Sequence, residues 1–358
     1  MGYSFCAGKI IGDTLYYSDD IINALCRVDL ISHQATFVKP FPNEKSIIRN
    51  QHIKCLEHQK KLYFIPNSGN YIHILDLYSE EIEYIKVPKQ VEGKFAISGA
   101  CFVDDVLWIF PANKNQSMIT LNVVDQSVEQ KGNFEKIIEN YKKEGVQDIW
   151  KIAKVDNQTY FALIGTKIVI RYSMVDESID VLETNVDGIE AVYACGRKLI
   201  ICTIDSKVYE WNIKYDSYKE IDFDNKIQEK NAYLVANKNS ESLYFIPNTG
   251  SSFYKYNMES KQLSRINTDL LSMELLTGVI NYAEYDLWDD KVVLFPRIGN
   301  NILIIENDSI FALDCNEIVD EGFKKKYYYS LGMFFENEAI KECARIGLDE
   351  YIQVLINQ

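Results

Sequence analysis

A nine-residue phrase that recurs along the chain constrains its fold more than any other feature. Leu62 to Asn70 reads LYFIPNSGN, and residues 243–251 read LYFIPNTGS. Looser or degenerate copies of the phrase start at residues 15, 107, 160, 199 and 292. Successive copies start about 39 to 53 residues apart, which is the spacing typical of β-propeller blades. The chain is therefore predicted to be an array of seven units.

Each unit divides into four short strands separated by turn residues, a pattern typical of all-β folds. The second unit predicts strands at residues 53–57, 62–65, 71–77 and 82–87, and the fifth unit predicts them at residues 191–195, 198–202, 208–213 and 218–221. Four strands in each of seven units account for residues 3 to 314, so residues 1–316 are predicted to form one all-β, seven-bladed propeller. Six or eight blades stay open as alternatives if the terminal units are miscounted.

The order of the strands and the form of their turns follow from residue type. First strands are rich in Ala and Gly, and innermost strands of a radial array have the least room, so we expect the first strand of each unit to line the central channel. Pro66, Pro111, Pro247 and Pro296 are expected to end second strands because proline has no amide hydrogen to donate. Asp-Ser sequences between third and fourth strands predict tight turns closed by side-chain oxygens.

Two insertions interrupt the array at residues 133–147 and 267–280, and both have helix-like composition or apolar spacing. Each connects a fourth strand to the next first strand. In an up-and-down blade, these connections lie on the same face as the Pro-Asn-x-Gly hairpins between second and third strands. Insertions on one face of a repeat protein often mark its binding surface, so this face is predicted to bind a partner.

The candidate binding residues are polar or aromatic groups expected on that face or at the mouth of the channel. They are Asn67, Asn70, Asn113, Asn115, Trp150, Asn248, Arg297 and Asn300. Two interpretations of the asparagines stay open, ligand contact and turn chemistry alone. Trp150 either packs beneath the inserted segment or presents a stacking surface, whereas Trp108 and Trp211 are expected to pack between blades.

Composition limits the partners and the compartment. The net charge of −14 and the absence of a large Lys/Arg cluster argue against nucleic acid. No apolar run approaches the roughly 20 residues of a membrane-spanning helix, and the N-terminus lacks the pattern of a secretory signal. The eight cysteines form no CxxC pair and are expected to be buried reduced thiols. We expect a cytoplasmic protein without a membrane partner.

No catalytic motif is present, neither a nucleophile elbow nor a phosphate-binding loop nor a zinc-protease helix. The four histidines, at positions 33, 52, 58 and 73, all fall in the first two units, whereas a metal at the axis usually takes ligands from several blades. No catalytic residue, metal site or cofactor is predicted.

Residues 317–358 form a separate C-terminal segment in which residues 336–357 predict an amphipathic helix. This helix either covers the propeller or docks a partner.

With its four-stranded repeat, the chain resembles the broad β-propeller group that includes kelch and WD40 proteins. It lacks the paired glycines of kelch repeats and the Gly-His and Trp-Asp signatures of WD40 repeats. The resemblance implies a non-enzymatic scaffold that binds a protein or peptide. The alternative is an enzyme or a receptor for a small ligand, a glycan or a peptide, with its site at the channel mouth.

Overall fold

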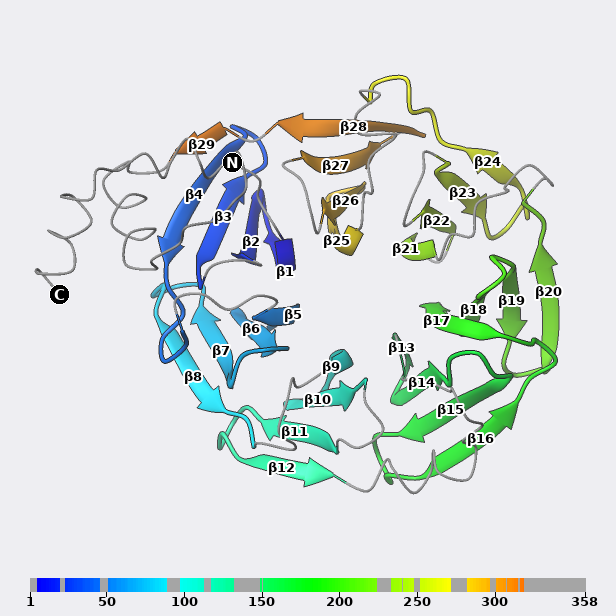
Figure 1. The fold of residues 1–358 in the computed structure, drawn as a ribbon, viewed down its shortest axis with the longest axis horizontal. Helices are drawn as coiled ribbons and strands as arrows, with labels where there is room; N and C mark the ends of the chain where they lie inside the picture. The colour runs from blue at the N-terminus through cyan, green and yellow to red at the C-terminus, as the bar shows by residue number, and fades with distance from the viewer. Residues whose placement is uncertain are drawn as a thin grey trace, which may run out of the picture.

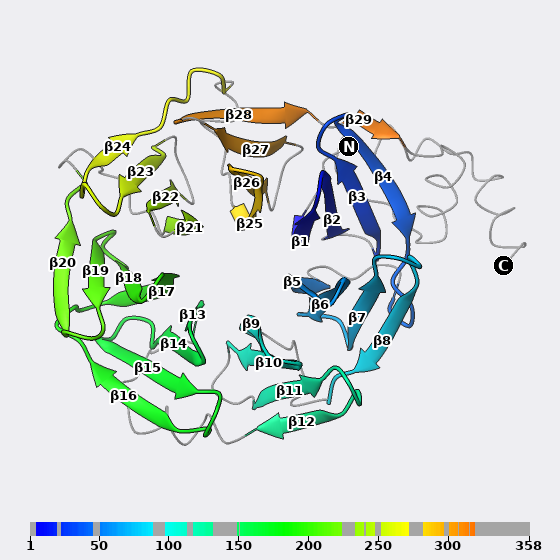
Figure 2. The ribbon, with the colours of Figure 1, turned by 180° about the vertical axis from the view of Figure 1, so that it is seen from behind.

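The protein is a ring of seven four-stranded antiparallel sheets around a central axis, a seven-bladed β-propeller (Figure 1; seen from behind in Figure 2). The computed structural model describes residues 5–19, 23–45, 51–88, 97–112, 117–131, 149, 151–223, 233–239, 241–247, 252–271, 282–296, 301–306, 308–314 and 316–318. All regular structure within these ranges is β-strand, which confirms the predicted all-β class and the count of seven blades.

The blades follow one another in chain order, with four consecutive strands in each. Blade 1 contains β1 (Phe5–Ile11), β2 (Thr14–Asp19), β3 (Leu25–Asp29) and β4 (Gln34–Lys39). Blade 2 contains β5 (His52–His58), β6 (Lys61–Pro66), β7 (Tyr71–Asp76) and β8 (Ile82–Lys86). Blade 3 contains β9 (Ile97–Val103), β10 (Val106–Pro111), β11 (Met118–Asn122) and β12 (Val128–Lys131). Blade 4 contains β13 (Ile152–Val155), β14 (Gln158–Ala162), β15 (Ile168–Ser173) and β16 (Ile179–Glu183).

Blade 5 contains β17 (Ile189–Cys195), β18 (Lys198–Thr203), β19 (Val208–Asn212) and β20 (Ser217–Ile221). Blade 6 contains β21 (Tyr233–Asn239), β22 (Ser242–Pro247), β23 (Tyr254–Asn257) and β24 (Leu263–Arg265). Blade 7 contains β25 (Tyr282–Trp288), β26 (Lys291–Pro296), β27 (Asn301–Glu306) and β28 (Ser309–Asp314). The strands predicted for the second and fifth units match blades 2 and 5 to within two residues.

The first strand of each blade lies innermost, as predicted from its small residues (Figure 1). Small side chains are needed there because neighbouring inner strands approach closely. A Cβ added at Gly8 of β1 would lie 3.1 Å from Leu15 Cδ1 and 3.3 Å from Phe295 Cε2 of blade 7. One added at Gly99 of β9 would overlap the side chain of Ile152 on β13 in the next blade. The glycines therefore permit contact between blades.

The second strands of blades 2 and 6 are almost completely buried. In β6 and β22, every residue after the first is buried, and Pro66 and Pro247 are the last residues of these strands. Pro111 and Pro296 end β10 and β26 in the same way. The prediction that proline ends the second strand is therefore confirmed in these four blades.

The hydrophobic core consists of seven clusters, each lying between two adjacent blades. Between blades 3 and 4, for example, Trp108 and Phe110 pack against Phe161 and Tyr172. Trp211 belongs to the cluster between blades 4 and 5. The predicted position of Trp108 and Trp211 between blades is confirmed. Each fully buried aromatic side chain contributes about 1.5–3 kcal/mol by leaving water, so most of the burial stabilises blade-to-blade contact.

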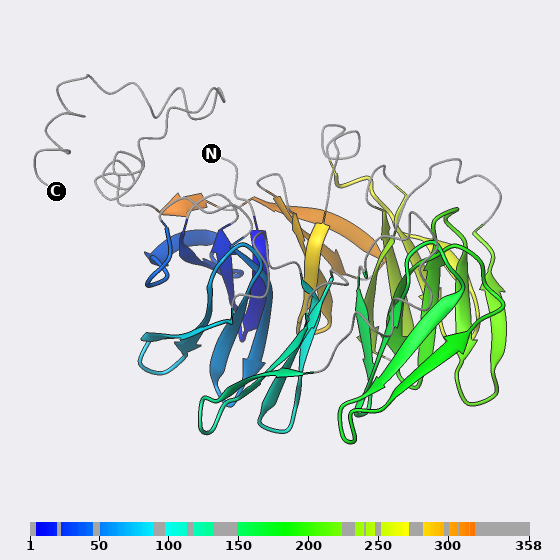
Figure 3. The ribbon, with the colours of Figure 1, turned by 60° about the horizontal axis from the view of Figure 1, so that its bottom comes forward.

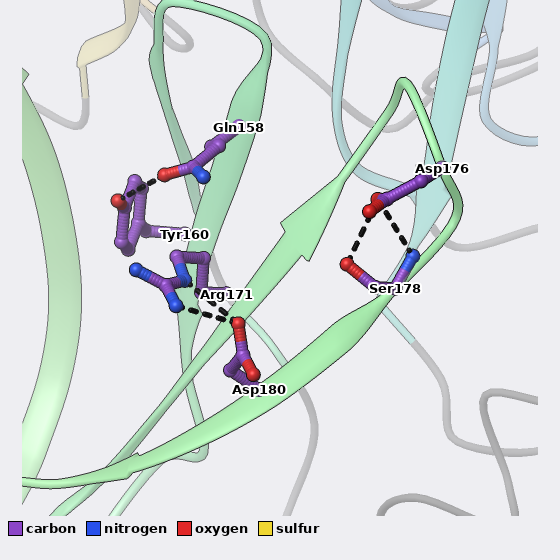
Figure 4. A network of polar contacts seen from close by, with 6 residues as sticks. All are labelled: Gln158, Tyr160, Arg171, Asp176, Ser178 and Asp180. Carbon is purple, nitrogen blue, oxygen red and sulfur yellow. Dashed lines mark hydrogen bonds and ion pairs between the residues drawn. The ribbon is translucent and has the colours of Figure 1, made fainter.

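The turns between third and fourth strands use the predicted aspartate chemistry. Asp176 accepts hydrogen bonds from the backbone N and the Oγ of Ser178, at 3.2 and 2.8 Å (Figure 4). Asp125 accepts the same two bonds from Ser127, at 2.9 and 2.6 Å. Gln126 and Glu177, the residues between, have positive φ angles of 59° and 57°. These aspartates are turn-forming residues.

The ring closes where blade 7 meets blade 1, and one strand beyond the seven sets of four is added to the sheet of blade 1. β29 (Asn316–Ile318), which follows blade 7, pairs in parallel with the outer edge of β4 in blade 1. This fifth strand lies at the periphery (Figure 1). It includes the predicted boundary at residue 316, while the predicted helix at residues 336–357 lies outside the described residues.

The two faces of the ring differ in the length of their connections. Turns between first and second strands are two residues long at residues 12–13, 59–60, 104–105, 156–157, 196–197 and 289–290. Connections between blades on the opposite face are longer, at residues 40–51, 87–96, 132–151, 184–188, 222–232 and 266–281. Figure 3 shows the tight hairpins on one side of the ring. The insertion at 133–147 lies outside the described residues, and of 267–280 only residues 267–271 are described, where Asn267 bridges to Ser309 of β28.

Candidate functional site

Four charged side chains on three inner strands meet near the axis of the ring. Nζ of Lys54 on β5 in blade 2 lies 2.7 Å from Oε1 of Glu284 on β25 in blade 7. Nζ of Lys9 on β1, in the blade between them, lies 2.7 Å from Oδ1 of Asp286. Alternate residues of a strand share a face, so Glu284 and Asp286 point the same way. The Lys54–Glu284 pair passes across blade 1, and the four side chains therefore converge on the channel.

Both members of the Lys54–Glu284 pair are held in their charged forms. Burial by itself raises the pKa of Glu284, but the charges of Lys54 and Lys151 and the hydrogen bond from Lys54 outweigh it and lower this pKa. Burial lowers the pKa of Lys54, but the charge and hydrogen bond of Glu284 reverse the shift and raise it. The side chain of Glu284 is only 11% exposed, so this pair is poorly screened by solvent.

These shifts oppose general acid-base chemistry at this pair. An efficient general acid or base has a pKa near the working pH. Here the pKa of Glu284 is lowered and the pKa of Lys54 is raised, so both pKa values lie further from pH 7 than usual. The second carboxylate, Asp286, is also occupied, because its Oδ2 accepts a 2.7 Å hydrogen bond from the backbone N of Ile10. The two ion pairs are instead suited to stabilise the contact between blades 7, 1 and 2.

A second polar cluster is a buried chain of hydrogen bonds between blades 1 and 2. Ser18 Oγ lies 2.7 Å from His52 Nδ1, and His52 Nε2 lies 2.9 Å from His73 Nδ1. His73 Nε2 then lies 2.9 Å from the carbonyl oxygen of Pro42. Ser18, His52 and His73 are each 0% exposed. The chain therefore runs from β2 to β5 and β7 without contact with solvent.

The carbonyl at the end of this chain sets the direction of every hydrogen bond in it. A carbonyl only accepts, so His73 Nε2 carries a proton and donates to Pro42. A neutral His73 then accepts at Nδ1, His52 donates from Nε2, and Ser18 donates its hydroxyl proton to His52 Nδ1. Burial lowers the pKa of His73 to about 4, partly offset by the Pro42 hydrogen bond. Burial, with the charge of His73, lowers that of His52 well below its usual value. Both rings are neutral at pH 7.

The hydrogen bond between Ser18 and His52 resembles that of an activated catalytic serine, but Ser18 is not accessible to a substrate. Both ring nitrogens of His52 and of His73 are engaged in hydrogen bonds, which leaves no lone pair for a metal ion. Ser18 is fully buried, so a substrate has no route to its hydroxyl in this structure. The chain instead ties two blades together. Within the described ranges, no group of three or more His, Cys, Asp or Glu side chains is placed to hold a metal ion.

Asn67 and Asn70, two of the predicted binding residues, lie in the connection between β6 and β7 of blade 2. The backbone N of Asn67 donates a 2.8 Å hydrogen bond to the carbonyl oxygen of Gln51. The backbone N and the side-chain Nδ2 of Asn70 both donate to the carboxylate of Glu44, the latter at 3.2 Å. The Pro-Asn-x-Gly hairpin thus holds the connection between blades 1 and 2, as the turn-chemistry interpretation expects. Asn70 is also exposed, so it remains available on the surface.

Gln51 lies beneath this hairpin and is completely buried. Neither its Oε1 nor its Nε2 has a hydrogen-bond partner among the described residues. An unpaired buried polar group costs roughly 1–3 kcal/mol of stability, so the side chain of Gln51 destabilises the fold at the position next to His52. Burial raises the pKa of the nearby Glu44, and the N–H groups of Asn70 offset part of this rise.

The other six predicted binding residues lie outside the described residues. They are Asn113, Asn115, Trp150, Asn248, Arg297 and Asn300. Their placement on one face stays a prediction.

The sequence analysis predicted neither the charged cluster near the axis nor the hydrogen-bonded histidine chain. A usable signal exists for the histidines. His52 lies opposite Pro66 and His73 lies opposite Phe64, and positions 64 and 66 share a face of β6. Strand parity across three strands therefore places the two rings on one side of blade 2. For the axis, the signal is a pair of carboxylates two residues apart in an inner strand.

The thiols are buried and poorly suited to nucleophilic chemistry. Cys26, Cys55, Cys101, Cys195 and Cys202 are buried and form no disulfide, as predicted. Burial raises the pKa of Cys101 to about 11 and that of Cys55 well above its usual value. Thiolates, not thiols, are the reactive species. The side chains of the other three cysteines lie outside the described part of the chain.

Comparison with known proteins supports the fold alone. No protein-family model and no curated protein matches this chain. PorZ, a surface component of the type-IX secretion system of Porphyromonas gingivalis, is 12% identical with a TM-score of 0.56, covering 89% of this chain and 39% of PorZ. The extracellular domain of BT4673 from B. thetaiotaomicron is 13% identical with a TM-score of 0.57, covering 85% of this chain and 38% of that one. The chain thus spans about two fifths of these two proteins.

The WD40 repeats of RRP9 are similar over most of both chains. They are 12% identical with a TM-score of 0.57, covering 82% of this chain and 87% of the RRP9 chain. The architecture is therefore that of WD40-like propellers, without their signature motifs. Within the described ranges there is no helix long and apolar enough to cross a membrane.

Proposed function

We propose that this protein is a non-enzymatic scaffold that binds a protein or peptide on the face that carries the long connections. One observation supports this proposal above all. The connections between blades on one face are 5 to 20 residues long, whereas the first-to-second-strand turns on the other face are two residues long. Longer connections on one face of a repeat protein are typical of its binding surface. The WD40-like architecture agrees with this use by analogy.

In this proposal Asn67, Asn70 and the six predicted residues outside the described ranges contribute to the binding surface. The protein acts in the cytoplasm, without nucleic acid, membrane, metal or cofactor. The inner-strand charges support the proposal because Lys54 and Glu284 already form an ion pair, and their pKa values are shifted away from pH 7, where a general acid or base would need them.

A second candidate function is an enzyme or a receptor for a small ligand at the channel mouth. The convergence of Lys9, Lys54, Glu284 and Asp286 on the axis favours it, because charged groups gathered at the axis are what such a site needs. We rank it second because all four charges are satisfied by one another or by the backbone.

The opposite face also offers contact groups and has to be included in any test. The turns between third and fourth strands carry exposed large apolar side chains in five successive blades, at Ile31, Tyr78, Val124, Val175 and Tyr215. Tyr78 is 97% exposed. Isolated apolar side chains are common on protein surfaces. Substitutions in these turns therefore serve as controls for substitutions on the proposed binding face.

The test is affinity capture from native cytosol, followed by measurement of the dissociation constant of any protein retained. A variant that lacks residues 134–145 and an Asn70→Arg variant alter the proposed face, and a Tyr78→Ser variant alters the other. We expect the first two to weaken binding about tenfold or more and Tyr78→Ser to leave it unchanged. Loss of binding with Tyr78→Ser alone would place the partner on the tight-turn face. Retention of no macromolecule by the intact protein would favour the small-ligand alternative.

A further inference from the structure

A groove lies between blades 5 and 6 and is lined by their outer strands. It encloses a cavity of about 550 Å³, which lies within the usual size range of small-ligand sites. One wall is β20 of blade 5 and the other is formed by β23 and β24 of blade 6. The lining residues are Lys219, Glu220, Ile221, Asp222, Ser252, Tyr254, Tyr256, Lys261, Leu263 and Arg265.

Strand register shows which of these side chains face the groove. Ile221 and Tyr256 belong to the hydrophobic cluster between blades 5 and 6, so they point into this junction. Lys219 is two residues from Ile221 and therefore points the same way. Leu263 lies opposite Tyr256 and Arg265 lies opposite Tyr254 in the β23–β24 pair. Each wall of the groove therefore presents one cation and apolar side chains to the other wall.

The floor and one end of the groove are closed by apolar packing. Tyr256 is 2% exposed and Ile221 is 4% exposed. The ring of Phe223 makes edge contacts with Phe245 and Tyr254, with centroids 5.0 and 5.4 Å apart. A ligand can therefore lie on a dry aromatic floor while its polar end faces the charged rim.

The charges of the groove are unevenly matched. Glu210 accepts ion pairs from Lys198 at 2.5 Å and from Lys261 at 2.6 Å, so its carboxylate is saturated. Lys219 and Arg265 have no ion pair with any residue that the structure describes. These two cations, from opposite walls, stand out in a chain with a net charge of −14.

Acidic residues near the groove do not cancel these cations. Glu220 alternates with Lys219 along β20 and lies opposite Tyr209, which packs in the cluster between blades 4 and 5. Its carboxylate is therefore on the other side of the sheet. Asp222 also lines the cavity and is the one carboxylate that opposes an anionic ligand there. The lining keeps an excess of positive charge.

An unsatisfied hydrogen-bonding group lies beneath the groove. The hydroxyl of Tyr256 is buried and has no hydrogen-bond partner among the described residues. Burial, with the charge of Glu210, raises the pKa of Tyr256 to about 12, so the hydroxyl keeps its proton at neutral pH and adds no negative charge near the groove.

We propose that this groove binds a phosphate monoester, with the phosphate between Lys219 and Arg265 and the organic group on Tyr254 and Leu263. A phosphate monoester carries about −1.5 to −2 charges at pH 7 and accepts from several donors, which matches two unpaired cations better than a carboxylate does. Arginine adds a planar pair of donors suited to phosphate oxygens. The phosphate group belongs either to a free small molecule or to a phosphorylated peptide.

The test is calorimetric titration of the full-length protein with phenyl phosphate, using phenol and benzoate as matched probes. We expect saturable binding of phenyl phosphate at concentrations below about 10 mM, weaker binding of benzoate and none of phenol. Arg265→Gln and Lys219→Gln should each weaken binding about tenfold. Lys86→Gln, which removes an exposed cation from β8 of blade 2, is the control and should leave binding unchanged.

A phosphotyrosine peptide compared with free phosphotyrosine then distinguishes the two sources. Tighter binding of the peptide identifies a phosphopeptide, and equal binding identifies a small phosphate ester. The proposal is overturned if phenyl phosphate does not bind the intact protein, or if Lys86→Gln weakens binding as much as Arg265→Gln. All three substituted residues are exposed, so the variants are expected to fold, which their circular dichroism spectra check.

Discussion

Blade 1 contacts blade 7 on one side and blade 2 on the other, and the two junctions use different polar groups. Toward blade 7, Asp286 bonds Lys9 and the backbone N of Ile10. Toward blade 2, Ser18 and two neutral histidines form a hydrogen-bonded chain. The polar contact toward blade 7 is a part-buried ion pair, whereas the polar contact buried between blades 1 and 2 is a neutral hydrogen-bonded chain. The ion pairs that join blades 1 and 2, Arg27–Glu80 and Lys39–Glu81, are exposed.

The difference follows from how the chain crosses each junction. Residues 40–51 link blade 1 directly to blade 2, so the two sheets are held near each other before any polar contact forms. Blades 7 and 1 are the last and first units, and the chain joins them only after the ring is complete, when the three-residue β29 leaves blade 7 and pairs with β4. The rest of their contact is made by side chains. Charge pairs act over longer distances than neutral hydrogen bonds. The comparison predicts that the two junctions respond to different perturbations.

The largest effect is expected from breaking the charged junction. Asp286→Ala leaves the Lys9 ammonium and the Ile10 amide without their acceptor in a part-buried site. Removing one member of a buried ion pair costs roughly 3–5 kcal/mol, and we expect about 3 kcal/mol because the Lys9 side chain is 30% exposed. The free energy of unfolding in urea at pH 7 measures it.

The control for this variant is Asp180→Ala, which breaks the exposed pair between Asp180 and Arg171 (Figure 4). An exposed pair is worth about 0–1 kcal/mol. Equal losses in the two variants would show that the axis pair does not hold the closure.

Acidification is expected to act on the neutral histidine chain between blades 1 and 2. The pKa of His73 falls from 6.5 to about 4 on folding, so below pH 6.5 the unfolded chain takes up a proton that the folded protein refuses. The stability present above pH 6.5 is therefore lost as the pH falls toward 4. His73 alone should lose about 2 kcal/mol between pH 7 and pH 5, and His52 adds a loss in the same direction.

Unfolding curves at a series of pH values test this expectation. A His73→Gln variant should show a shallower slope of unfolding free energy between pH 7 and pH 5. His33→Gln is the control, because His33 is exposed in a turn of blade 1, and should keep the wild-type slope. An unchanged slope in His73→Gln would refute the assignment of a neutral buried ring.

A smaller effect is expected at the end of the histidine chain. Ser18→Ala removes the hydroxyl donor from His52 Nδ1 and leaves that nitrogen buried without a partner. Such a loss costs about 1–2 kcal/mol. Ser178→Ala removes a hydroxyl from an exposed turn hydrogen bond with Asp176 and should change the unfolding free energy by less. A Ser18→Ala variant as stable as the wild type would mean that the hydroxyl does not donate to His52.

Features that repeat within a blade could be predicted from the sequence. Pro66 and Pro247 end second strands because proline lacks an amide hydrogen, and Asp176 closes its turn because its oxygen reaches Ser178. Each depends on residues close in the chain. The innermost position of the first strand also followed from its small residues, since Gly99 has room for no side chain beside Ile152.

Contacts between blades could not be predicted in the same way. Lys54 and Glu284 are separated by 230 positions and meet only because the ring closes. Strand parity places Glu284 and Asp286 on one face, but it does not say which lysine reaches them. The groove of Lys219 and Arg265 likewise depends on the angle between two sheets. Such sites follow from the arrangement of blades, which the repeat phrase does not encode.

The smallest effect is expected from the outer part of the closing junction. Trp288 Nε1 donates a 2.9 Å hydrogen bond to Asp13 Oδ1, which joins blade 7 to the first turn of blade 1. Asp13→Ala removes the acceptor while the indole keeps its packing and its contact with Lys291. Because Asp13 is exposed, we expect a loss of about 1 kcal/mol in the unfolding free energy. Asp13→Asn keeps an oxygen acceptor and should restore most of this loss. If both variants lose the same amount, the charge of Asp13 rather than its hydrogen bond stabilises the junction, and the contrast with the neutral histidine chain between blades 1 and 2 becomes sharper.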